Sequence, residues 1–90
     1  SEPVPTSREA AVVMLADTVE AAVRTLKKPT IPKISKYVWD LFLYKITEQQ
    51  LNNSELTLKD LEIIKNTFVH ILAGYFHARI EYPQNNGNEN

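Results

Sequence analysis

The segment 6–26, TSREAAVVMLADTVEAAVRTL, constrains the fold most strongly, because it has the pattern of one helix that carries a single acid, Asp17, in an otherwise apolar half. Every residue from Ala10 to Ala16 is Ala, Val, Met or Leu, and a helix that is apolar all round is normally buried. Asp17 follows this run directly. A buried carboxylate is costly unless it is paired, hydrogen-bonded or bound to a metal. We therefore expect Asp17 either to have a neutralising neighbour or to bind a cation.

Glu20 and Arg24 offer the simpler explanation for Asp17. They lie one and two helical turns further along nearly the same line, and their own i,i+4 spacing favours an ion pair worth roughly 0.3 kcal/mol. On this interpretation Asp17 lies at the rim of the core beside the pair, and no metal is required. The chemistry of these three residues leaves both interpretations open.

Helical periodicity predicts an all-α fold, a small bundle of three main helices at about 7–27, 31–49 and 58–79. Thr6 and Glu9 match a capping box at the first start, and Thr57 with Asp60 forms a similar signal at the third. Thr30 precedes the second helix as a plausible N-cap. The predicted packing positions recur every three or four residues: Ala11, Val12, Leu15, Ala16, Val19, Ala22, Val23 and Leu26, then Ile34, Val38, Leu41, Phe42 and Ile46, then Leu61, Ile64, Phe68, Ile71, Leu72 and Tyr75.

Two details qualify this helical pattern. Gly74 inside the third helix costs roughly 1 kcal/mol relative to Ala, which favours a close backbone contact or a small bend there. Tyr37, Trp39 and Tyr44 lie off the apolar stripe of the second helix. Aromatic residues in such positions can stack on nucleobases, but packing or an interface is the more usual role.

Composition restricts the domain organisation and the partners. Ninety residues with 43% hydrophobic content make one domain. We place this domain at residues 1–83 and expect residues 84–90 to form a polar, disordered tail. A net charge of −1 gives no basic surface for nucleic acid. The chain has no cysteine and therefore no thiolate metal site. Its longest apolar run, Ala10–Ala16, is far shorter than the roughly 20 residues of a membrane span.

Three stretches resemble a known family: EAAVVMLADTVEAAVR at 9–24, LTLKDLEIIKNTF at 56–68 and GYFHARIEYP at 74–83. In order and spacing they are similar to the C-terminal part of the HD domain of the bacterial seven-transmembrane HD-family metal phosphohydrolases, which hydrolyse cyclic di-AMP. The resemblance implies that Asp17 is the last protein ligand of a divalent metal pair, Mn or Fe. It also implies that Glu20 and Arg24 support Asp17, and that His77, Arg79 and Tyr82 line the site or brace the tail.

The chain departs from this family in one important respect. It contains no His-Asp doublet, and its two histidines, His70 and His77, are each followed by an apolar residue. Seven residues along one helix separate them by about 10 Å, which is too far for one metal. We therefore expect a fragment that lacks the other metal ligands, binds no cofactor alone and is inactive without the remainder of the HD domain, its main expected partner.

The resemblance also sets expectations for the parent protein. It would be a cyclic di-AMP phosphodiesterase anchored in the bacterial inner membrane, with this domain in the cytoplasm and the piece itself soluble. The alternative is a non-catalytic helical interaction or dimerisation module. On either hypothesis the first helix needs covering on more than one side, so the isolated piece should form homo-oligomers or expose apolar surface.

Overall fold

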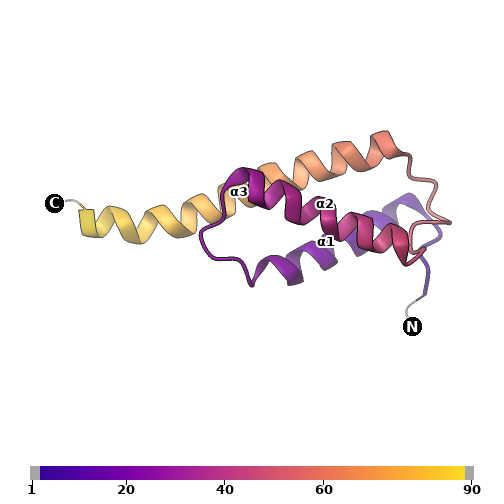
Figure 1. Ribbon diagram of the computed structural model, residues 1–90, viewed down its shortest axis with the longest axis horizontal. Helices are drawn as coiled ribbons and strands as arrows, with labels where there is room; N and C mark the ends of the chain where they lie inside the picture. The colour runs from indigo at the N-terminus through magenta and orange to yellow at the C-terminus, as the bar shows by residue number, and fades with distance from the viewer. Residues whose placement is uncertain (1–2, 89–90) are drawn as a thin grey trace.

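The protein folds into three helices, seen in a computed structural model that describes residues 3–88, with side chains described through His77. They are α1 (Arg8–Val23), α2 (Ile31–Thr47) and α3 (Leu58–Asn88). The chain runs up, down and up, so that α1 and α3 are parallel to each other and antiparallel to α2 (Figure 1). The described residues contain no strand, and the predicted all-α fold is confirmed.

The shape is elongated because α3 is much longer than its neighbours. The molecule measures 55 × 26 × 19 Å, and Figure 1 shows the C-terminal part of α3 continuing beyond the other two helices. α2 packs against both α1 and α3, whereas the backbones of α1 and α3 approach each other at few points. α2 is therefore the central helix of the bundle.

The helix starts follow from local capping hydrogen bonds. The first start differs from the prediction: Ser7, not Thr6, is the N-cap of α1, and its hydroxyl accepts from the Ala10 amide at 3.1 Å. The predicted capping box of Thr6 with Glu9 is therefore wrong. Thr30 caps α2 as predicted. At α3 the predicted pair is reciprocal, since the Asp60 amide donates to the Thr57 hydroxyl and the Thr57 amide donates to the Asp60 carboxylate.

Two helix ends also differ from the prediction. α1 ends at Val23, before the expected position near 27, because the amides of Thr25 and Leu26 form tight-turn hydrogen bonds to the carbonyls of Ala22 and Val23. Lys28 then takes a positive φ of 50° ahead of Pro29. α3 continues to Asn88, beyond the predicted end near residue 79. The tail proposed at 84–90 falls where no side chains are described, and its disorder remains a prediction.

One apolar core lies between the three helices. α1 contributes Leu15 and Val19, α2 contributes Val38 and Phe42, and all four are almost fully buried. Leu61 and Phe76 complete the core from α3. The ring of Phe42 meets that of Phe68 edge-on, with 6.0 Å between centroids. Most of the predicted packing positions on α1 and α2 are thereby confirmed as core or half-buried.

The packing of α3 differs from the predicted face in its second half. Ile71 and Tyr75 were expected inside but are 60% and 47% exposed, and Phe76 is buried in their place. Gly74 is also not in close contact, since a Cβ added there would meet no atom within 4 Å. The backbones of α1 and α3 make few contacts with each other, so Ile71 borders the hollow between these helices and stays largely exposed.

The loop between α2 and α3 is organised by one buried serine. Ser54 is 1% exposed, its hydroxyl donates to the Leu51 carbonyl at 2.9 Å, and it accepts from the Leu56 amide at 3.3 Å. Positive φ angles at Gln49 and Glu55 reverse the chain on either side. The predicted turn at 51–56 therefore positions the start of α3.

Candidate functional site

Asp17 lies on the outer surface of α1 and is exposed. The core face of this helix consists of Ala11, Leu15, Val19 and Val23, and Asp17 points away from it. The expectation of a buried acid is therefore wrong within this chain: α1 has one buried face, because α2 and α3 cover only one side. No hydrogen bond or ion pair joins Asp17 to another described residue.

The ion pair that the simpler explanation predicted, between Glu20 and Arg24, is present in the structure. Arg24 donates to Glu20 at 2.5 Å and forms an ion pair with it, so the arginine does not neutralise Asp17. This hydrogen bond and the charge of Glu20 raise the pKa of Arg24 above its ordinary value. The side chains of both partners are about two-thirds exposed. The pair contributes little to stability but places two charges one and two turns beyond Asp17.

The residues around Asp17 on the outer face are small or apolar. Val13 and Ala21 lie one turn before and after it and are exposed, as is Ala10. Val13 is 59% exposed. The Asp17 carboxylate is therefore accessible at the exposed surface of α1.

The remaining predicted site residues are not brought together with Asp17 by any described contact. His70 and His77 are exposed on α3. Arg79 and Tyr82 lie outside the residues whose side chains are described. Among residues 3–77 no three His, Asp or Glu side chains are grouped closely enough to hold a metal ion. Asp17 is thus at most one donor of a metal site, and the described residues alone do not form one.

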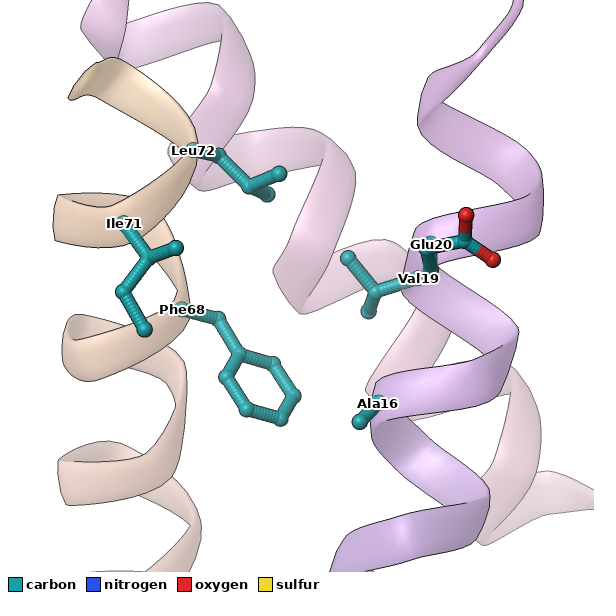
Figure 2. Close-up of a pocket in the computed structure, with 6 residues that line it drawn as sticks. All are labelled: Ala16, Val19, Glu20, Phe68, Ile71 and Leu72. Carbon is teal, nitrogen blue, oxygen red and sulfur yellow. The ribbon is translucent and has the colours of Figure 1, made fainter. Parts of the chain in front are cut away.

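The structure shows a feature that the predicted site does not include, an apolar groove between α1 and α3. One hollow of about 230 Å³ is lined by Ala16, Val19, Glu20, Phe68, Ile71 and Leu72. Figure 2 shows the Phe68 ring extending across the gap toward α1, while the Glu20 carboxylate points away from the hollow. A second hollow of about 520 Å³ lies between the first turns of the same helices. We call the two together the α1–α3 groove.

The sequence contained a signal for this groove. The wide apolar surface of the first helix and the predicted face of the third already exceeded what three helices can bury. Ile71 belongs to the predicted face of the third helix and is exposed, and Val13 and Ile63, outside the predicted faces, are exposed as well. This agrees with the expectation that the isolated piece exposes apolar surface.

The aromatic residues of α2 are mainly used for packing. The Tyr37 hydroxyl donates to the Ala22 carbonyl at 3.3 Å. Trp39 is half-buried against Phe42, and the Lys65 ammonium lies 6.0 Å from its ring centroid. Tyr44 is 57% exposed and has no such contact described. Packing is thus the observed role of Tyr37 and Trp39.

Similar sequences and similar solved structures both point to the same known protein, the phosphodiesterase PgpH. The chain is 43% identical over 82 residues to the cyclic-di-AMP phosphodiesterase PgpH of Bacillus subtilis and 34% identical over 83 residues to PgpH of Listeria monocytogenes. The crystal structure of the L. monocytogenes PgpH HD domain in complex with cyclic-di-AMP superposes with a TM-score of 0.77 over 83% of this chain, at 31% identity. The chain is homologous to part of this HD domain. The resemblance inferred from the three sequence motifs is thereby confirmed.

The similarity to the HD domain covers only part of the known proteins. The match includes 91% of this chain but 12% of B. subtilis PgpH. In the solved HD domains it covers 35% of the domain with cyclic-di-AMP and 37% of a second crystal structure, whose TM-score is 0.78. A scan against protein-family models matched none. No helix within the described residues is long and apolar enough to cross a membrane.

Proposed function

We propose that this chain is the part of a metal-dependent HD-domain phosphohydrolase that supplies one metal ligand, Asp17, for hydrolysis of a cyclic dinucleotide. The observation that carries the proposal is the match to PgpH across nearly the whole chain. The exposed position of Asp17 supports it, because a ligand for a shared metal must be accessible to donors from outside this unit.

The donor set of the chain fits this role only in part. Carboxylate oxygens bind divalent first-row metals such as Mn or Fe well, but one acid cannot hold a metal pair. The His and His-Asp ligands must come from the remainder of the HD domain. When bound, a metal pair supplies a hydroxide nucleophile and clamps the phosphodiester. Within this chain, the Glu20–Arg24 pair would position α1 around Asp17, and His77, Arg79 and Tyr82 would line the site or brace the tail.

The first test is metal content in the intact HD domain. Asp17→Asn keeps the size and exposure of the side chain and removes its charge, so bound Mn or Fe should fall by at least half while the helical circular dichroism is retained. Glu9→Gln, an exposed acid on the same helix, is the matched control and should leave the metal unchanged. Unchanged metal in Asp17→Asn would refute the assigned role.

The second test uses the 90-residue chain alone. With added Mn²⁺ it should neither retain stoichiometric metal after gel filtration nor cleave cyclic di-AMP, since the other ligands are absent. An enzyme-like rate from the isolated chain would show that the site is complete without the rest of the domain. In the parent, we place this domain in the cytoplasm below a membrane anchor, as the resemblance implies.

A non-catalytic interaction or dimerisation module is the second candidate. Exposed Val13, Ile63 and Ile71 favour it, since apolar residues at an open groove are typical of a binding surface. The Asp17→Asn experiment separates the two candidate functions. In an interaction module, this substitution should change neither the metal content nor the binding of the partner.

A further inference from the structure

A hollow between the first half of α2 and the first turns of α3 combines apolar walls with charged groups. Its volume of about 620 Å³ lies within the range of roughly 300–1,000 Å³ that is usual for small-molecule sites. The only tryptophan of the chain forms part of its wall, and we call it the Trp39 hollow. It is lined by Pro32, Ser35, Lys36, Trp39, Leu58, Glu62 and Lys65.

The Trp39 hollow contains one cation whose contacts are all with uncharged groups. Lys65 is half-buried. Its ammonium donates to the Ser35 hydroxyl at 3.4 Å and lies 6.0 Å from the centroid of the Trp39 ring. A hydroxyl and an aromatic ring stabilise an ammonium group but do not neutralise its charge.

The other charged groups of the hollow already have partners of opposite charge. Lys36 pairs with Asp40 at 2.8 Å, and Glu62 pairs with Lys59 at 3.9 Å. Among the described residues, no carboxylate pairs with Lys65. Because charged groups that are withdrawn from water are normally paired, the half-buried Lys65 ammonium favours an anion from outside the chain.

Ser35 offers a second donor beside this ammonium. Its hydroxyl oxygen accepts from Lys65, and a hydroxyl group also has a hydrogen of its own to donate. The described hydrogen bonds include none that the Ser35 side chain donates. Two donor groups 3.4 Å apart can therefore contact the same phosphate or carboxylate group, and hydrogen bonds to such an anion are stronger than those between neutral groups.

The rest of the wall is apolar and comes from both helices. Pro32 and Trp39 line it from α2, and Leu58, which is 75% exposed, lines it from α3. The Trp39 ring is held in place by its tilted contact with Phe42. A flat aromatic ring has the large apolar area needed to cover these side chains.

We infer that the Trp39 hollow binds a small molecule that carries a phosphate or carboxylate group on an apolar ring. The anionic group contacts Lys65 and Ser35, and the ring lies against Trp39 and Leu58. This inference goes beyond the proposed function, because it uses no residue of α1 and no metal.

Trp39 fluorescence in the 90-residue chain reports directly on binding. Phenyl phosphate should change the emission in a saturable way, with a Kd of about 1 mM or tighter. Inorganic phosphate lacks the ring and benzyl alcohol lacks the charge, so each should bind at least about tenfold more weakly. Benzoate tests the carboxylate form of the ligand, and the tighter of the two ring compounds identifies the preferred anion. No saturable change with either ring compound, or equal binding of inorganic phosphate, would overturn the inference.

Matched substitutions test the assigned contacts. Lys65→Gln should weaken the binding of phenyl phosphate at least about tenfold, because it removes the charge. Lys33→Gln, at an exposed lysine of α2 outside the hollow, is the control and should leave the Kd unchanged. Ser35→Ala should weaken binding by a smaller factor, and it serves as the test if circular dichroism shows that Lys65→Gln does not fold. An unchanged Kd in the folded Lys65→Gln or Ser35→Ala variants, or an equal loss in Lys33→Gln, would contradict the assigned site.

Discussion

At the residue scale, Thr57 and Asp60 form a reciprocal pair of capping hydrogen bonds at the start of α3. The Thr57 amide donates to the Asp60 carboxylate at 2.9 Å, and the Asp60 amide donates to the Thr57 hydroxyl at 3.0 Å. The hydrogen bond from the Thr57 amide is the main reason that the pKa of Asp60 lies below its ordinary value. Burial partly opposes this effect by raising the pKa, and the Thr57 hydroxyl and the charge of Arg8 make smaller contributions that lower it.

The lowered pKa of Asp60 predicts a pH dependence with a definite sign. The folded state binds this proton less readily than the unfolded state, so the contribution to stability is present above the unfolded pKa and is lost as pH falls through the folded value. Urea midpoints of the wild type should therefore fall more between pH 5 and pH 3 than those of Asp60→Asn. Parallel curves for the two proteins would show that Asp60 does not titrate differently on folding.

At the element scale, α1 combines a buried face with an exposed one despite its uniform composition. Leu15 is fully buried and Val13, two residues earlier, is 59% exposed. The two residues point to different sides of the helix, and only the side facing α2 and the core is covered in this chain. Packing, not composition, therefore distinguishes them.

Leu15→Ala should destabilise the 90-residue chain by about 2–5 kcal/mol, because it removes buried methyl groups and leaves a cavity. Val13→Ala, the matched control at an exposed position of α1, should change the free energy of unfolding by less than about 0.5 kcal/mol. Urea titrations followed by circular dichroism measure both. Similar losses for the two variants would mean that the outer face of α1 is also covered in solution.

Gly74→Ala should stabilise the chain by about 0.5–1 kcal/mol. The position lies inside α3, and an added Cβ would meet no atom within 4 Å, so the gain in helix propensity is not offset by a clash. Thermal unfolding of the 90-residue chain gives the difference. A lower Tm in the variant would indicate that Gly74 has a close neighbour after all.

At the scale of the whole molecule, α2 holds the fold together. It packs against both other helices, whereas the backbones of α1 and α3 make few contacts with each other. The α2–α3 pair has the more extensive contact of the two, and α1 is attached mainly along its core face. The bundle is thus open on the side of the α1–α3 groove.

This asymmetry predicts unequal hydrogen exchange. α1 can detach while α2 and α3 remain paired, so the amides of Leu15 and Val19 should exchange faster than those of Val38 and Phe42, by a sub-global opening. Native-state exchange followed by NMR measures these rates residue by residue. Equal protection in α1 and α2 would indicate a single cooperative unit, which contradicts the expected order.

The sequence by itself determined the number of helices, their starts at Thr30 and Thr57, and the family resemblance around Asp17, because capping and 3.6-residue periodicity are local signals. It misplaced the first cap, the end of α1 and the inner face of α3. Only the tertiary structure decided that Asp17 is exposed and that α1 and α3 leave a groove. These depend on which faces three helices can cover at once, and burial is set by neighbours that are distant in the sequence.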